Sequence, residues 1–373
     1  MSLIPDSLRR LPWDMLIVLF AITAFGLATL YSAAGADVSP WALNQGIRFI
    51  AIFGLMCVVS LVPVSTWMKI AYPFYAITLG LLLVVELFGK IGMGAQRWID
   101  LGIIRLQPSE FMKIAVVLTL ARFYHRTPPM FTSSPAIVLA GAAIVGVPAG
   151  LVMLQPDLGT AMMITFAGVC LMFLAGTAWR YFIGGGAAVL VMAPVGWAML
   201  HDYQKNRILI FLDPDSDPLG TGYHISQSKI AIGSGGFWGK GFLSGTQSHL
   251  EYLPETHTDF IFATMMEEWG MIGGIFIALT YGYLIRWGSR LGNNSRFRFT
   301  QLTALGLSFT LFLYVGINLS MVMGLAPVVG IPLPLMSYGG SAMLTVLLLL
   351  GILMAFHRDE QRSAGLGKDW LHN

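Results

Sequence analysis

Apolar stretches of about 20 residues recur along the whole chain, and no other feature limits its fold so strongly. In a lipid bilayer each backbone N–H and C=O group must find a partner inside the protein, which an α-helix provides within one segment. Only 11% of the residues are charged, against about 25% in soluble proteins, so the chain cannot cover a water-exposed surface. We therefore predict an all-α, polytopic membrane protein that forms one domain over residues 1–373. Its ten transmembrane helices are expected at about 13–34, 46–65, 69–89, 109–124, 135–154, 159–177, 181–200, 259–286, 300–322 and 341–357, with the fourth and the last short.

The distribution of Lys and Arg between the loops predicts the orientation of these helices. An even number of helices places both termini on one side of the membrane, and basic residues crowd on that side. Examples are Arg9 and Arg10 near the start, and Arg122 and Arg126 at the connection between the fourth and fifth helices. By the positive-inside rule this side is cytoplasmic, so the long loop of about 202–258 faces outward, between the seventh and eighth helices. The net charge of +3 does not indicate binding to nucleic acid.

Asp259 lies where this outer loop re-enters an apolar segment, in the string LPETHTDFIFA. A carboxylate at a water–membrane boundary can accept a proton close to lipid head groups while it is shielded from bulk water. This placement predicts a general base for chemistry on a membrane-anchored substrate. His249, Glu251, Glu255 and His257 also suit a metal ion by residue type, but their spacing matches no established zinc site, so a metal remains unassigned. We expect His257 to position the loop or to form local hydrogen bonds.

Polar residues also flank the fourth and sixth helices. Glu110 and Lys113 are i,i+3 neighbours on one face of the fourth helix. They either form a structural pair that holds helices together, or Glu110 steadies a phosphate-facing Lys113. Arg97 lies in the amphipathic string GAQRWIDLGIIRLQPSE, where we expect a short element that packs on the outer face. Asp157, in QPDLGT, is expected to cap the sixth helix.

The outer loop contains a glycine-rich run, GSGGFWGKG, whose spacing matches neither standard phosphate-binding loop. We expect its glycines to permit tight turns and close backbone packing. The cations Arg207, Lys229 and Lys240 are candidates to face an anionic head group. Glu267 and Glu268 follow inside the eighth helix, and at least one must face the protein interior or a cation, because a carboxylate that faces lipid is costly.

The connection between the ninth and tenth helices is MGLAPVVGIPLPLMSYGGS, with three prolines, four glycines and no charge. Irregular backbone at membrane depth has to be buried in protein or line a wet cavity. Ser337 and Tyr338 of this connection, together with Gln227 of the outer loop, complete the candidate substrate contacts.

Several strings are too specific for a generic membrane protein: GAQRWIDLG, QPSEFMKIA, QPDLGTA, DPLGTGYHISQSKIAIGSGG, GTQSHLEYLPETHTDFIFA and LPLMSYGGS. With them, over nearly its whole length, the chain resembles the SEDS family (shape, elongation, division and sporulation) of bacterial cell-wall polymerases. The DYQKNRI…GSGG block and GLAPVVGIPLPLMSYGGS favour the elongation branch over the division branch. The chain departs from the usual pattern of the family in ETHTD and in the EEW that follows, but the aspartate is in place.

The resemblance implies a peptidoglycan glycosyltransferase that acts on lipid II in the bacterial cytoplasmic (inner) membrane. Asp259 matches the essential loop aspartate of the family, and Glu110 and Lys113 match its polar positions on the fourth helix. An α-linked donor and a β-1,4 product require one inversion, so Asp259 is expected to act as the single base. The residues expected to bind the pyrophosphate or the sugars are Arg97, Glu110, Lys113, Arg207, Gln227, Lys229, Lys240, His257, Ser337 and Tyr338.

The same resemblance implies partners and leaves alternatives. A class B penicillin-binding protein is expected to crosslink the strands, beside other membrane proteins of the elongation complex. No motif requires a cofactor, and the positive charge opposite the pyrophosphate comes either from side chains or from a divalent cation such as Mg²⁺ or Mn²⁺. The alternative functions are a lipid II flippase or other transporter, a division-type polymerase and a non-catalytic scaffold.

Overall fold

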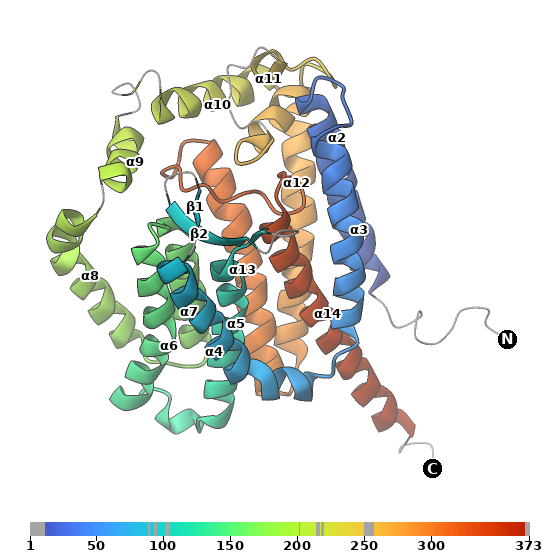
Figure 1. Cartoon of the computed structure of the whole chain (residues 1–373). Helices are drawn as coiled ribbons and strands as arrows, with labels where there is room; N and C mark the ends of the chain where they lie inside the picture. The colour runs from blue at the N-terminus through green and yellow to red at the C-terminus, as the bar shows by residue number, and fades with distance from the viewer. Residues whose placement is uncertain are drawn as a thin grey trace.

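A computed structural model describes residues 12–88, 90–92, 95–100, 105–200, 202–213, 217, 220–249 and 257–369. Ten long helices dominate this part of the chain (Figure 1), as the apolar pattern predicted. Eight of them are long and apolar enough to cross a membrane, whereas α7 has only 17 residues and α5 carries several charges. The prediction of an all-α polytopic membrane protein is confirmed. The helices are α2 (Trp13–Ala33), α3 (Trp41–Ser60), α4 (Val64–Phe88), α5 (Pro108–Arg126), α6 (Pro135–Leu154), α7 (Leu158–Leu174), α8 (Trp179–Met199), α12 (Ile261–Asn294), α13 (Arg298–Val322) and α14 (Gly340–Asp369).

Several of the predicted helix boundaries are wrong by five residues or more: α3 covers 41–60 instead of 46–65, α4 begins at 64 instead of 69, and α12 and α14 continue to 294 and 369 instead of 286 and 357. The second helix, α3, begins at Trp41 and not at 46, because Gln45 and Arg48 face protein partners in spite of their polarity. The last helix, α14, is not short, since it continues to Asp369. Its extension packs on the turn between α3 and α4, where the Asp359 carboxylate accepts a hydrogen bond of 2.8 Å from the backbone N–H of Val64.

The connections also contain secondary structure. The string before α5 forms a small antiparallel sheet in the order β1 (Lys90–Gly92), β2 (Ala95–Asp100), β3 (Arg105–Leu106), so the expected short element is a sheet. The long loop contains three helices, α9 (Asp202–Leu212), α10 (Thr221–Gly235) and α11 (Thr246–His249). Helices α10 and α11 lie across one end of the bundle, at the top of Figure 1, and α9 lies at the left margin between α8 and α10. A short 3-10 turn, Pro129–Phe131, precedes α6.

Helices α5, α7 and α13 form the centre of the bundle, and α5 is buried on nearly every face from Met112 to Ala121. The three helices meet at Gly306 of α13. A β-carbon added there would lie 2.7 Å from a methyl carbon of Leu171 and 2.8 Å from one of Val117, so a larger residue would displace these side chains. In contrast, α8 lies at the margin of the bundle (Figure 1), and no residue of its apolar window is buried.

Helix α12 is broken at Gly270, whose φ of +59° is not helical. In a regular helix the N–H groups of Met271 and Ile272 would bond the carbonyls of Glu267 and Glu268. Here the glycine-rich run, residues 235–241, inserts its backbone into the break, and we call it the glycine clasp. The four replacement bonds are Met271 N–H to Gly236 O (3.0 Å), Ile272 N–H to Phe237 O (3.4 Å), Lys240 N–H to Glu267 O (3.0 Å) and Gly241 N–H to Glu268 O (3.0 Å). The prediction that these glycines permit close backbone packing is confirmed.

Candidate functional site

Asp259 lies in the turn of residues 257–260 that leads directly into α12. Its backbone carbonyl accepts a hydrogen bond of 3.0 Å from the side-chain amide of Asn318. The same amide nitrogen donates to the carbonyl of Ile331 at 2.7 Å. Asn318 is fully buried on α13, so one rigid side chain joins the Asp259 turn to the irregular connection that follows α13.

That connection, residues 323–339, is called the crossing segment below. Its Gly330 has a φ of +74°, and a β-carbon there would lie 3.4 Å from Oδ2 of Asp259. The backbone of the crossing segment thus runs beside the carboxylate. At its end, the N–H of Tyr338 donates to the carbonyl of His257 at 2.7 Å. The uncharged connection is therefore one wall of the site around Asp259, as irregular backbone buried in protein should be.

Ser337 is buried, and its hydroxyl accepts a hydrogen bond of 2.8 Å from the N–H of Leu333. Its carbonyl accepts a bond of 2.8 Å from the Gln45 side chain, whose oxygen accepts a bond of 3.3 Å from Gly339. These bonds close a tight turn of the crossing segment and anchor it to α3. The contacts of Ser337 are thus structural, and Tyr338 is the half-buried neighbour.

Aromatic and basic side chains from α3 complete this region. The His257 ring stacks on Trp41, with 4.1 Å between ring centres and an angle of 4° between the planes. The guanidinium of Arg48 lies 4.7 Å from the centre of the Tyr338 ring, which is itself 6.0 Å from His257. The expected positioning role of His257 is consistent with its stacking and with the bond to Tyr338 N–H. Trp41 and Arg48 were not among the predicted site residues.

Glu110 and Lys113 form a buried ion pair of 2.6 Å, with residue exposures of 5% and 1%. The Lys113 ammonium also donates to the Tyr314 hydroxyl at 2.7 Å, and that hydroxyl donates in turn to Glu110. Such burial with three mutual bonds favours the structural interpretation of the pair. Tyr314 and Asn318 are one helical turn apart on α13, so the same helix connects this buried triad to the Asp259 turn.

The predicted cations of the long loop have different surroundings. Lys229 of α10 lies against the start of the crossing segment, because a β-carbon at Gly324 would be 2.2 Å from its Cε. The neighbouring Ser228 donates to the carbonyl of Val322 at 2.7 Å, which fixes α10 over the end of α13. Gln227 of α10 and Arg207 of α9 are half-buried.

Lys240, in contrast, forms an ion pair of 2.6 Å with Glu267 and donates to Thr246 at 2.7 Å. Glu267 is fully buried and also accepts from the N–H groups of Thr246 and Gln247. Glu268 is buried too and accepts from the Ser32 hydroxyl of α2. The prediction that these carboxylates face the interior or a cation is confirmed, and Lys240 is that cation.

Asp157 caps α7 as predicted, since Oδ1 accepts from the N–H of Thr160 at 3.2 Å. Its other oxygen accepts a bond of 3.2 Å from the Gln107 amide, which ties the start of α5 to the start of α7. This contact orders the end of the bundle on which the Asp259 turn also lies.

Some predicted residues fall outside the described part. Glu251 and Glu255 lie among the residues that are not described, and of Arg97 and His249 only the backbone is described, in β2 and α11. Within the described ranges, no three His, Cys, Asp or Glu side chains gather in a way that could hold a metal ion. The described residues thus offer no ready-made metal centre, and a divalent cation at the site stays a prediction.

Sequence reasoning missed Trp41, Gln45, Arg48 and Asn318. Arg48 and Gln45 had a signal, because polar residues inside or beside an apolar stretch need a protein partner. Asn318 had the same signal inside the ninth predicted helix. Trp41 had none, since an aromatic residue at a helix end is typical of any membrane boundary.

The chain is similar to proteins of known family. A family of cell cycle proteins named for FtsW, RodA and SpoVE matches residues 12–362. The peptidoglycan glycosyltransferase MrdB of Escherichia coli is 46% identical over 348 residues, which cover 92% of each protein. The probable peptidoglycan glycosyltransferase FtsW of Trichlorobacter lovleyi is 35% identical over 376 residues, which cover 98% of each.

Solved structures agree with these relatives. A chain of a peptidoglycan synthase complex that coordinates polymerization and crosslinking is 30% identical and superposes with a TM-score of 0.80, over 94% of this chain and 98% of that one. The rod shape determining protein RodA of Thermus thermophilus is 27% identical, with a TM-score of 0.71 over 94% of this chain and 97% of its own. Because the family match spans nearly the whole chain, this protein belongs to the FtsW, RodA and SpoVE family of cell cycle proteins, the SEDS family.

Proposed function

We propose that this protein is a RodA-type peptidoglycan glycosyltransferase that polymerises lipid II, with Asp259 as its general base. The enzyme class and the elongation branch rest on the 46% identity to MrdB over 92% of the chain. The role of Asp259 rests on the position of this residue in the fold. It precedes α12, and the Asn318 amide and the crossing segment hold it from two sides.

The reaction is a single in-line displacement. The 4-hydroxyl oxygen of the acceptor sugar forms a bond to the anomeric carbon of the donor, while the bond from that carbon to the pyrophosphate oxygen breaks. The electron pair of the broken bond leaves with the polyprenyl pyrophosphate, and Asp259 accepts the hydroxyl proton. A positioned base of this kind contributes about 10²–10⁴-fold to the rate. No glycosyl-enzyme forms, because one inversion converts the α-linked donor to a β-1,4 product.

Positive charge is needed opposite the departing pyrophosphate. Arg48 and Lys229 are suited to this role, since both contact the crossing segment, at Tyr338 and at Gly324. Neither takes part in an ion pair in the described ranges. Lys240 and Lys113 are less available, because carboxylates already hold their ammonium groups.

The orientation follows the basic residues. The end of the bundle with α10 faces outward from the bacterial cytoplasmic membrane, and both termini are cytoplasmic. The lipid tails of the substrate then stay in the bilayer while its sugars meet at the outer face. A class B penicillin-binding protein supplies the transpeptidase, and other membrane proteins of the elongation complex join them. The similarity to a chain of a synthase complex that couples polymerization and crosslinking supports this pairing.

The test uses the purified protein in vesicles with labelled lipid II. Glycan strands that lysozyme-type hydrolases can digest are the expected product, released together with polyprenyl pyrophosphate. Transfer of lipid II between leaflets without polymer would instead identify a flippase, and the proposal would be abandoned.

A further inference from the structure

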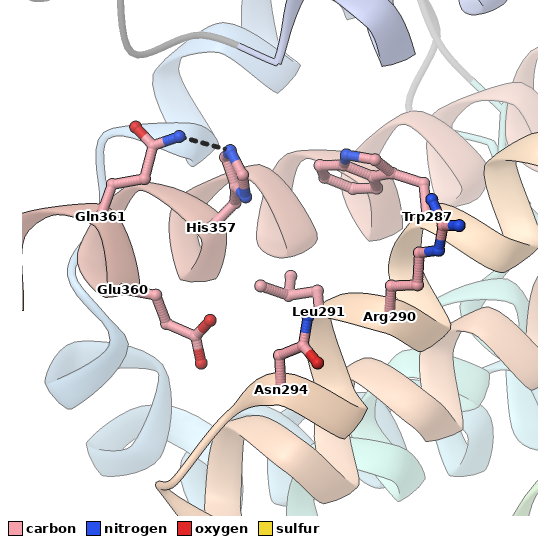
Figure 2. A pocket seen from close by; sticks show the side chains of 7 residues that line it. All are labelled: Trp287, Arg290, Leu291, Asn294, His357, Glu360 and Gln361. Atoms are coloured by element: carbon pink, nitrogen blue, oxygen red, sulfur yellow. Dashed lines mark hydrogen bonds between the residues drawn. The ribbon is translucent and has the colours of Figure 1, made fainter. Parts of the chain in front are cut away.

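A pocket of about 380 Å³ lies between the last turns of α12 and the extension of α14 (Figure 2). These parts of α12 and α14 lie at the end of the bundle opposite α10 (Figure 1). None of the pocket residues takes part in the Asp259 region. Trp287, Arg290, Leu291 and Asn294 come from α12, and His357, Glu360 and Gln361 come from α14.

The level of the pocket along the helices corresponds to that of the lipid head groups. By length and composition, the candidate membrane span of α12 runs to Asn294 and that of α14 to Arg362, so both walls lie near the ends of these apolar helices. Trp287 is half-buried here, and its ring centre is 5.6 Å from that of His357. Tryptophan is enriched at this level of the membrane, because its ring is apolar and its N–H group is polar.

The two walls carry opposite charges that do not pair with each other. Arg290 of α12 and Glu360 of α14 both line the pocket, with the guanidinium beside Trp287 and the carboxylate toward Asn294 (Figure 2). In the described part of the chain, the ion pairs within 4.0 Å are Lys113–Glu110 and Lys240–Glu267. An arginine and a glutamate that face one space unpaired can bind a ligand that has one charge of each sign.

The α14 wall is held in place. Arg358 donates to the carbonyl of Leu61, and Asp359 accepts from the N–H of Val64, so this side of α14 packs on the turn between α3 and α4. The opposite side presents Glu360 to the pocket. Gln361 lies 2.8 Å from the ring nitrogen of His357, which orders both side chains. The pocket is therefore built before any ligand arrives.

We propose that this pocket binds the head group of a phospholipid that has a phosphate and a primary ammonium, as phosphatidylethanolamine does. The phosphate accepts hydrogen bonds from the planar guanidinium of Arg290. The ammonium donates to the Glu360 carboxylate. Trp287 and Leu291 contact the glycerol and the first carbons of the acyl chains. A choline head group has no N–H to donate, and a glycerol head group has no cation for Glu360, so both should bind more weakly.

The experiment measures the lipids that the full-length protein retains in native mass spectrometry, after equilibration in vesicles with equal amounts of phosphatidylethanolamine, phosphatidylcholine and phosphatidylglycerol. We expect the wild type to retain phosphatidylethanolamine about tenfold over the others, the ratio that one charge-assisted hydrogen bond provides. Glu360→Gln should abolish this preference, and Arg290→Ala should lower the retention of all three lipids. Arg296→Ala, which removes an exposed arginine outside the pocket lining, is the matched control and should behave as the wild type.

Equal retention of the three lipids by the wild type would overturn the proposal, and so would an Arg290→Ala protein that retains all three lipids as strongly as the wild type. Glycerophosphoethanolamine, the same head group without acyl chains, separates a lipid from a soluble ligand. If it displaced the lipid at equal concentration, the ligand would be a soluble metabolite and the lipid assignment would be wrong. Melting temperatures in detergent exclude misfolding of the variants. The readout is independent of glycan synthesis, so it stands even if the proposed enzymatic function fails.

Discussion

Asn318 holds two segments with one amide group, and both acceptors are backbone carbonyls next to the proposed base. Replacing it with alanine leaves two carbonyls without their donor, at a cost of about 1–3 kcal/mol for each group that stays buried. We expect Asn318→Ala to lower the polymerisation kcat by about tenfold or more through misplacement of Asp259, with a KM for lipid II close to that of the wild type.

The matched control for Asn318→Ala is Thr303→Val on the same helix. The Thr303 hydroxyl is buried and has no hydrogen-bond partner in the described part of the chain. This variant should keep both the kcat and the melting temperature of the wild type. Equal losses in the two variants would mean that α13 tolerates no change, and the positioning role of Asn318 would be unsupported.

Lys113 tests which interpretation of the buried pair is right. Lys113→Met leaves the Glu110 carboxylate buried without its cation, and breaking a buried pair in this way costs about 3–5 kcal/mol. We expect a clearly lower melting temperature, with partial recovery in the double variant Glu110→Gln/Lys113→Met. If the single variant kept its melting temperature but raised the KM for lipid II, Lys113 would be a phosphate ligand instead.

At the residue scale, the sequence was sufficient to predict site residues that are charged within an apolar segment. It was not sufficient for residues whose role depends on their contacts in the folded protein. Asp259 and the pair Glu110–Lys113 are charges in apolar surroundings, which a single chain reveals. Asn318 and Arg48 matter because of what they touch, and the contact of Arg48 with Tyr338 joins residues far apart in sequence. From the sequence, Lys240 was a candidate to bind the substrate, but in the structure it forms an ion pair with Glu267.

At the scale of elements, the glycine clasp joins the long loop to α12, the helix that Asp259 precedes. Gly239 has a φ of +82°, and a β-carbon there would lie 2.0 Å from the carbonyl oxygen of Glu268. Gly239→Ala should therefore displace the clasp from the break in α12, with a lower melting temperature and faster proteolysis of the long loop. Gly282→Ala, within α12, is the control, because a β-carbon at Gly282 meets nothing within 4 Å. Wild-type behaviour of Gly239→Ala would show that the clasp is dispensable.

The elements themselves were predictable to different degrees. Ten apolar runs were enough for the ten long helices, because the bilayer requires their length. The end of α14 was not predictable, since its extension depends on the turn between α3 and α4. The break at Gly270 was not predictable either, because the four hydrogen bonds that make it tolerable come from the glycine clasp.

At the scale of the whole molecule, the orientation in the membrane is a separate prediction. Asn206 and Arg362 are exposed. Helix α9, which contains Asn206, lies toward the upper end of the bundle in Figure 1, and the last part of α14, which contains Arg362, lies at the lower end. In a background without Cys57 and Cys170, we expect a cysteine at 206 to react with an impermeant maleimide in intact cells. A cysteine at 362 should react only after lysis. The reverse pattern would invert the topology and remove Asp259 from the side where glycan is made.

The overall arrangement was less predictable than the helix count. Hydropathy does not tell which helix is central, and α5, which carries several charges, is the one that is buried on nearly every face. Its Glu110 and Lys113 pair with each other inside the bundle, and Lys113 also donates a hydrogen bond to Tyr314. The crossing segment, in contrast, was expected from its composition to be buried in protein or to line a wet cavity, and its residues 333–337 are buried.

The most direct test of the catalytic account is glycan synthesis by purified Asp259→Asn protein with labelled lipid II. Asparagine has almost the same shape as aspartate but is not a base, so we expect polymer formation to fall by about 10²-fold or more while the protein stays folded and inserted. Asp202→Asn, an exposed carboxylate at the start of α9, should polymerise lipid II as the wild type does. Glycan strands made by Asp259→Asn at the wild-type rate would contradict the assignment of Asp259 as the general base.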